Sequence, residues 1–132
     1  MRVFLDTVGL LAVWDKSDQW HAAAEDCLGK LLASRADLVT TTYVLLECGN
    51  AAARRPYRLA VSQLRERMEE SGRLIAPTRE DWENAWRVYA SGGKDQAGMV
   101  DLVSFAVMRR LGISQAFTND RHFQQAGFEI LF

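Results

Sequence analysis

The chain has 132 residues, of which 48% are apolar and 25% are charged, and its formal net charge is −1 at pH 7. This length predicts a single domain, residues 1–132, that buries roughly two thirds of its unfolded surface. The composition is ordinary for a globular protein in water, and the net charge gives no overall attraction to nucleic acid. Uncharged stretches such as residues 38–46 are far shorter than the ~20 residues of a membrane-spanning helix, so no membrane span is expected.

The N-terminus and the cysteines indicate a cytoplasmic protein. Asp6 interrupts the apolar N-terminal run and no small-residue cleavage site follows, so we expect no signal peptide. Cys27 and Cys48 lie in predicted helices without a CxxC motif and are expected to be buried, reduced thiols. His21 and His122 pair with no cysteine at metal-ligand spacing, so a zinc site is not expected.

Short apolar runs alternate with segments of helical periodicity along the whole chain. The apolar runs predict five strands, at residues 2–5, 38–41, 74–76, 116–117 and 128–131. The helical segments predict helices at residues 7–14, 18–34, 42–53, 56–71, 78–91 and 100–111, and a short one that starts at residue 120. Strand–helix alternation with nearly continuous apolar strands predicts an α/β fold, with a parallel sheet covered on both faces.

Four acidic residues stand where burial makes a charge costly. Asp6 and Asp120 each follow the end of a predicted strand. Glu47 and Asp101 lie inside strongly apolar helical segments. In parallel sheets of this kind, ligands bind beyond the carboxyl ends of the strands, where the strand order reverses. If the first and fourth strands are neighbours at that reversal, Asp6 and Asp120 converge over one crevice, although each also fits the N-cap of the helix that follows it.

The chemistry that suits four converging carboxylates is divalent-metal binding. Carboxylates brought together repel one another, and this raises their pKa values unless a cation neutralises the group. Oxygen ligands without thiolate or imidazole suit Mg²⁺ or Mn²⁺, bound as one or two ions. Such ions lower the pKa of bound water and hold a phosphodiester for in-line displacement. Thr118 is a candidate to orient a water or a phosphate oxygen, or is simply a β-branched residue at the end of a strand.

Four motifs of the chain resemble those of PIN-domain nucleases, and most closely those of the VapC-type toxins of prokaryotic toxin–antitoxin pairs. The motifs are Leu5-Asp6-Thr7, Leu45-Leu46-Glu47, the segment 100–108, and Phe117-Thr118-Asn119-Asp120-Arg121-His122-Phe123. They occur in the order of the family and extend over essentially the whole chain. Val8 departs from the family pattern, because many members have Asn or Ser at that position, which bears on specificity more than on metal binding.

The resemblance implies a PIN-like three-layer α/β/α fold with a five-stranded parallel sheet. It implies metal ligation and catalysis by four acids with Thr118 assisting, the acids being Asp6, Glu47, Asp101 and Asp120. It further implies Mg²⁺- or Mn²⁺-dependent endonucleolytic cleavage of RNA, an antitoxin protein that masks the site, and a homodimer. The expected function is therefore an endoribonuclease toxin of a type II toxin–antitoxin system.

Other function classes fit the residues less well. A phosphate-receiving signalling domain needs adjacent acids after the first strand, but Asp6 stands alone. A haloacid-dehalogenase-like phosphatase needs a second Asp where Val8 stands. The alternative that stays open is a catalytically weak or inactive PIN-fold module that binds RNA or a protein partner.

Three residues near the acids have open roles. Asp95 is either an extra ligand or a loop turn residue, and the turn is the better expectation. Asn50 bonds either to a metal-bound water or to a local carbonyl. Arg121 either contacts substrate phosphate or offsets the acidic charge.

Two surface features complete the sequence pattern. Residues 54–79 contain seven arginines and three glutamates. This local excess of positive charge fits either contact with phosphates or a solvated helix with ion pairs along its surface. Among the tryptophans, Trp82 and Trp86 are expected to form a packing stripe. Trp14 and Trp20 are expected to fill the core rather than contact a partner.

Overall fold

The computed structural model of the protein describes residues 1–92 and 96–132. Its centre is a five-stranded parallel sheet with the order β3-β2-β1-β4-β5. The strands are β1 (Arg2–Leu5), β2 (Asp37–Thr41), β3 (Leu74–Ile75), β4 (Gln115–Phe117) and β5 (Glu129–Ile130). The first and fourth strands are therefore neighbours, with Leu5 opposite Phe117, and the strand order reverses between them as the sequence argument required.

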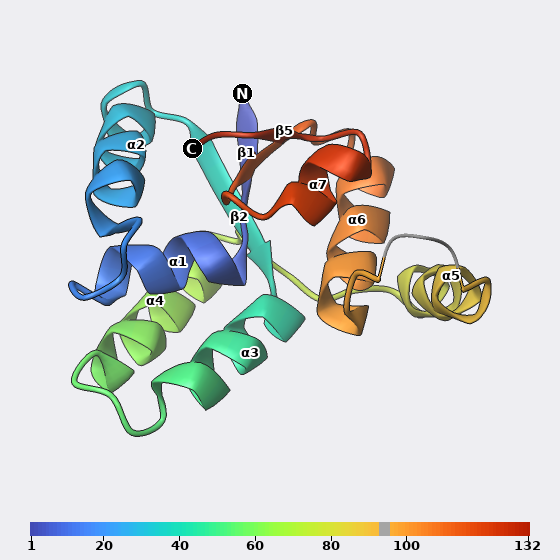
Figure 1. Ribbon diagram of the computed structural model, residues 1–132, viewed down its shortest axis with the longest axis horizontal. Helices are drawn as coiled ribbons and strands as arrows, with labels where there is room; N and C mark the ends of the chain where they lie inside the picture. Colours follow the sequence, from blue (N-terminus) through green and yellow to red (C-terminus); the bar gives the residue numbers. More distant parts are fainter. Residues whose placement is uncertain (93–95) are drawn as a thin grey trace.

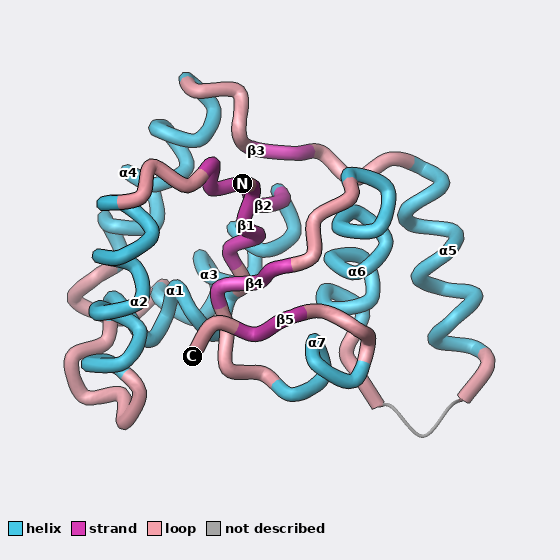
Figure 2. The backbone as a smooth tube through the Cα atoms, turned by 90° about the horizontal axis from the view of Figure 1, so that it is seen from above, coloured by secondary structure: helices cyan, strands magenta, loops and turns pink. Residues whose placement is uncertain are grey.

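Helices cover the sheet on both sides. In the described part of the chain they are α1 (Thr7–Trp14), α2 (His21–Ala33), α3 (Thr42–Ala52), α4 (Arg58–Glu70), α5 (Arg79–Ala90), α6 (Met99–Leu111) and α7 (Arg121–Gln125). Figure 1 shows α1 to α4 on one side of the strands and α5 to α7 on the other. In the turned view of Figure 2 the strands again lie between the α1–α4 group and α6 with α5. The predicted three-layer α/β/α architecture is confirmed.

Two helices begin later than the sequence pattern predicts, because a turn replaces their first residues. α2 begins at His21 rather than Asp18, since the Asp18 carboxylate accepts a hydrogen bond from the backbone N–H two residues later, at 2.7 Å. α4 begins at Arg58 rather than Pro56, and the Arg58 N–H donates to the carbonyl of Arg55 at 3.1 Å. The strands agree with their predicted ranges to within one residue at each end.

The core is continuous across the sheet, and α6 is its central helix. Its buried residues fall on more than one face: Leu102, Val103, Ser104, Phe105, Val107 and Met108. Because α6 is buried on several sides, its apolar residues cover more of its surface than those of a helix with one side exposed to solvent. Among the described residues, every helix is too short or too polar for a bilayer span.

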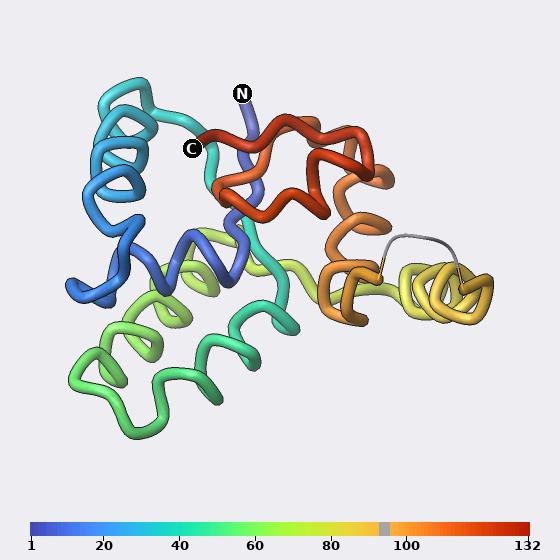
Figure 3. The backbone as a smooth tube through the Cα atoms, in the orientation of Figure 1, coloured from blue at the N-terminus to red at the C-terminus, as the bar shows by residue number. Residues whose placement is uncertain are grey.

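The beginning of α1 is pressed against the end of β4. A Cβ atom on Gly9 would lie 2.2 Å from the carbonyl oxygen of Phe117, a distance that no side chain tolerates. The backbone N–H of Asp6 reaches the same carbonyl oxygen at 3.4 Å. Figure 3 shows α1, α3 and α6 all beginning near the carboxyl end of β1. This close packing brings together residues from β1, α3, α6 and the segment after β4, at the carboxyl ends of the central strands.

Candidate active site

The carboxylate of Asp6 is buried at the junction of β1 and α1, where only 1% of the residue is exposed. Its Oδ2 accepts a hydrogen bond from the Thr118 hydroxyl at 2.8 Å and one from the Val8 backbone N–H at 3.4 Å. Its Oδ1 has no hydrogen-bond partner among the described residues. Burial raises the pKa of Asp6 to about 7, and the charge of Asp120 adds to the rise although the bond from Thr118 opposes it.

Thr118 ties Asp6 to the loop that carries Asp120. Its hydroxyl donates to Asp6 and accepts a hydrogen bond from the backbone N–H of Asp120 at 3.0 Å. The side chain is fully buried. In this arrangement the hydroxyl links the side chain of Asp6 to the backbone of Asp120.

Glu47 and Asp101 approach the other two acids from separate helices. Glu47 lies on α3 and Asp101 lies in the first turn of α6, and both are half-buried. The pKa of Asp101 is raised to about 8, chiefly by burial and then by the charges of the three other acids. The structure thus brings together all four acids that the sequence singled out. We call Asp6, Glu47, Asp101 and Asp120 the acid cluster.

His122 belongs to the same site, although the sequence argument did not select it. One donor atom from each of Asp101, Asp120 and His122 lies within 4.8 Å of the others. The His122 ring Nδ1 is 2.9 Å from Asp120 Oδ1, and its backbone N–H donates to the same oxygen at 2.9 Å. The sequence signal for His122 is its position two residues after Asp120, in the first turn of a helix. A search for cysteine partners at zinc-ligand spacing does not detect it.

The acid cluster fits a hard divalent cation. The pKa values of Asp6 and Asp101 are raised chiefly by burial, and the charges of neighbouring acids add to the rise. Among the described residues, the buried Oδ1 of Asp6 is an acceptor without a donor. Carboxylate oxygens are the ligands that Mg²⁺ and Mn²⁺ prefer. An ion bound here would neutralise the repulsion and give the unpartnered oxygen a positive neighbour.

The neighbouring candidates have less defined places. Asp95 lies outside the described residues. Asn50 is exposed and lines an apolar hollow together with Glu47 and Trp82. Arg121 is exposed at the start of α7.

The arginine-rich segment is largely paired. The arginines at 55, 65, 73 and 79 make ion pairs with Asp15, Glu69, Asp37 and Glu83 respectively. These pairs favour the structural interpretation of the segment, because most of its excess positive charge is offset locally.

The tryptophans and cysteines only partly follow expectation. Trp20 was expected to fill the core, and this is wrong: it is 46% exposed, because it stands in the turn before α2. Trp14 is half-buried and stacks on Tyr57.

Both cysteines are free thiols. Cys48 is buried as expected, and this burial raises its pKa to about 12, whereas Cys27 is only half-buried.

The expected stripe on α5 exists as edge contacts between aromatic rings. The ring centroids of Trp82 and Trp86 are 5.7 Å apart, and those of Trp86 and Tyr89 are 5.3 Å apart. All three residues are nevertheless exposed. The stripe therefore packs against itself while much of it faces solvent.

A parallel sheet with this strand order, carrying converging acids beyond the ends of β1 and β4, defines a class of α/β proteins whose acidic site could hold a metal ion. Residues 3–129 match the PIN domain family, and the chain belongs to that family. The 23S rRNA-specific endonuclease VapC20, found in two strains of Mycobacterium tuberculosis, is 33% identical over 128 residues, which cover 96% of this chain and 95% of VapC20.

Two solved structures have the same fold. The crystal structure of M. tuberculosis VapC20, described as a Sarcin-Ricin loop cleaving toxin, has a TM-score of 0.81 and 29% identity, and the match covers 96% of this chain and 95% of that one. The structure of FitAcB from Neisseria gonorrhoeae has a TM-score of 0.66 and 18% identity, with coverage of 100% and 97%. The second likeness concerns the fold alone.

Proposed function

We propose that this protein is an endoribonuclease that hydrolyses RNA phosphodiester bonds with Mg²⁺ or Mn²⁺, and that it is the toxin of a type II toxin–antitoxin pair. The relative VapC20 is named an endonuclease specific for 23S rRNA and is described as a toxin. The observation that carries the proposal is the acid cluster itself. Its carboxylates interact electrostatically although they come from four segments, and the buried Asp6 keeps one oxygen without a partner.

In this proposal the acid cluster would hold the ion, and the ion would supply a bound water of lowered pKa and positive charge beside the phosphodiester. The chain's own contribution is to fix the ligand positions. The Thr118 hydroxyl fixes the direction of Asp6 and also holds the Asp120 backbone. The backbone N–H of His122 fixes the Asp120 side chain at the start of α7. Burial of Asp6 among core residues keeps water from its inner side.

We also propose an antitoxin partner, a homodimer and a cytoplasmic location. A nuclease that cuts ribosomal RNA in its own cell needs an inhibitor, and its substrate is in the cytoplasm. The exposed aromatic strip of α5 supports a contact with another protein chain, because exposed apolar patches mark such surfaces. A small upstream gene that encodes a DNA-binding antitoxin would support the toxin role. Light scattering on the purified protein measures the oligomeric state.

Cleavage of purified 23S rRNA tests the catalytic proposal. With Mn²⁺ or Mg²⁺ the wild-type protein is expected to cut this RNA at discrete positions, and EDTA is expected to stop the reaction. The variants Asp6→Asn and Asp101→Asn are expected to lose at least about 100-fold in rate, because each removes a charge on which the ion depends.

The matched control is Glu83→Gln, which removes a carboxylate on the surface of α5 that pairs with Arg79 and is not among the groups that shift the pKa values of Asp6 and Asp101. It is expected to cleave like the wild type. If Asp6→Asn and Asp101→Asn cut as fast as Glu83→Gln, the acid cluster is not the catalytic site and the proposal fails.

A further inference from the structure

His122 stands where an additional metal ligand would stand, and this inference rests on the proposed function. It is half-buried in the first turn of α7. It offers a ring nitrogen within 4.8 Å of carboxylate oxygens of both Asp101 and Asp120. A separate observation favours a cation at this site, since Asp6 is 1% exposed and its Oδ1 has no partner among the described residues.

The spacing suits two ligands of one ion. Adjacent ligands of an octahedral ion at about 2.1 Å are about 3.0 Å apart, and opposite ligands are about 4.2 Å apart. The distance between His122 Nδ1 and Asp120 Oδ1 is 2.9 Å, which matches adjacent positions. The widest separation in the group of three exceeds the opposite spacing by at most about half an ångström. A small side-chain movement therefore closes the group around an ion.

The same ring nitrogen serves either role of the imidazole. In the structure Nδ1 makes the hydrogen bond with Asp120 Oδ1. To bind a metal, Nδ1 would offer its lone pair and Nε2 would carry the ring proton. The His122 backbone N–H donates to the same Asp120 oxygen at 2.9 Å, which keeps the ring beside the carboxylate.

We infer that His122 is a nitrogen ligand of the bound metal and that it makes the site prefer Mn²⁺ over Mg²⁺. Four carboxylates alone discriminate little between these two hard ions. An imidazole nitrogen binds Mn²⁺ more readily than Mg²⁺, which takes oxygen ligands. The competing role for His122 is to orient Asp120 through the hydrogen bond only, with no contact to the metal.

Metal binding measured by calorimetry separates the two roles. His122→Gln is expected to lose at least about 10-fold in Mn²⁺ affinity while its Mg²⁺ affinity stays the same, because only Mn²⁺ uses the nitrogen. His21→Gln is the matched control, since His21 is the only other histidine and bonds instead to Ala12 and Glu25. This control is expected to bind both ions like the wild type.

Pulsed electron paramagnetic resonance of bound Mn²⁺ gives a second measurement that does not depend on affinity. The ¹⁴N modulation of a bound imidazole is expected in the wild type and in His21→Gln, and is expected to be absent in His122→Gln. A wild-type protein that binds Mn²⁺ without ¹⁴N modulation overturns the inference and leaves the proposed function intact. Equal loss of Mn²⁺ and Mg²⁺ affinity in His122→Gln also overturns it, and assigns His122 the orienting role.

The same titrations report on the proposed function separately. Asp101→Asn is expected to lose affinity for both ions, whereas His122→Gln loses it for Mn²⁺ alone. A wild-type protein that binds neither ion overturns the metal-dependent function, and the inference with it.

Discussion

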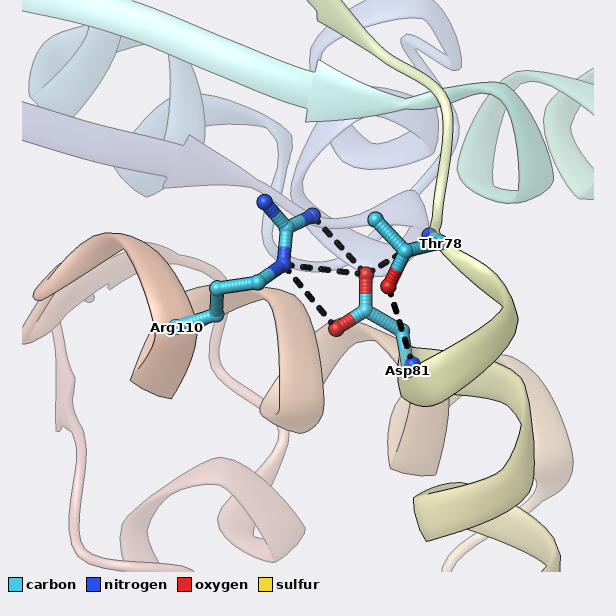
Figure 4. A network of polar contacts seen from close by, with 3 residues as sticks. All are labelled: Thr78, Asp81 and Arg110. Carbon is cyan, nitrogen blue, oxygen red and sulfur yellow. Dashed lines mark hydrogen bonds and ion pairs between the residues drawn. The ribbon is translucent and has the colours of Figure 1, made fainter.

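Two aspartates of this protein are almost fully buried, yet their surroundings shift their pKa values in opposite directions. Asp6 is 1% exposed and Asp81 is 2% exposed. Figure 4 shows Asp81 between Thr78 and Arg110. The Arg110 Nε lies 3.1 and 3.2 Å from the two carboxylate oxygens, and its Nη2 lies 2.8 Å from Oδ2. Thr78 completes a capping box with bonds of 2.8 and 3.1 Å.

Burial works to raise the pKa of Asp81, but the hydrogen bonds from Arg110 and Thr78 outweigh it, and the pKa lies below its usual value. The pKa of Asp6 is instead raised to about 7, because burial and the charge of Asp120 outweigh the hydrogen bonds from the Thr118 hydroxyl and from nearby backbone N–H groups. A buried carboxylate with its own cation therefore stabilises the fold, whereas one without a cation is available to a ligand. The contrast separates the structural acid from the functional one.

The largest test of this contrast is the pH dependence of stability without metal. The usual pKa of both Asp6 and Asp101 is 3.8, but in the folded protein the values are about 7 and about 8. The folded state therefore binds more protons. Stability from these groups is fully present below about pH 4 and is lost as the pH rises through 7 and 8. The expected fall is about 1.4 kcal/mol per pH unit for each proton.

Urea unfolding in EDTA between about pH 5 and about pH 8 measures this fall. Adding Mn²⁺ at the upper end is expected to restore the lost stability, because the ion replaces the protons as the compensating charge. Constant or rising stability over this range without metal would mean that the acid cluster is already compensated within the protein.

The next effect in size is the loss of the Asp81 pair. Asp81→Asn is expected to lower the free energy of unfolding by about 3 kcal/mol, since it removes the buried carboxylate that binds the partly exposed Arg110 and weakens the capping box. The loss should be the same with and without metal. It should also be constant above about pH 5, because a lowered pKa keeps Asp81 ionised there.

Chemical denaturation of Asp81→Asn beside Glu83→Gln checks this value, since Glu83 is exposed and its pair with Arg79 contributes at most about 0.5 kcal/mol. If the two variants lose the same amount, the buried pair is no more important to the fold than a surface pair.

The smallest effect has the opposite sign. Asp6→Asn is expected to raise the free energy of unfolding of the metal-free protein by about 2 kcal/mol near pH 8, because it removes a buried charge that repels the other acids. Below about pH 4 the gain should vanish, since Asp6 is then protonated in both the folded and the unfolded state. Added Mn²⁺ should stabilise the wild type but not the variant. A metal-free variant less stable than the wild type at pH 8 would contradict the argument.

Local patterns were enough to predict most elements of the fold. The apolar runs located all five strands, and the helical periodicity placed the start of α5 at Thr78, whose side chain caps that helix. The starts of α2 and α4 were missed, because Asp18 and Pro56 fit a helical start equally well and the turns before these helices decide the matter. These choices depend on competing hydrogen bonds of similar free energy, which a propensity argument does not separate.

The sequence predicted the four acids of the acid cluster, but it did not predict the Asp81–Arg110 pair or the contact of His122 with the acids. Asp6 and Asp120 were expected to converge only if β1 and β4 paired, and they do pair. The ion pair of Asp81 with Arg110, which is 29 residues away along the chain, left no local signal. His122 was missed because its partners, Asp101 and Asp120, are acids rather than cysteines.

The sequence by itself determined where strands end, which residues cap helices and which carboxylates stand in apolar surroundings, because these depend on near neighbours along the chain. Only the tertiary structure decided which buried carboxylate pairs with an arginine and which has, among the described residues, an oxygen without a hydrogen-bond partner. Charge interactions depend on distance in space and on the surrounding dielectric, and folding sets both.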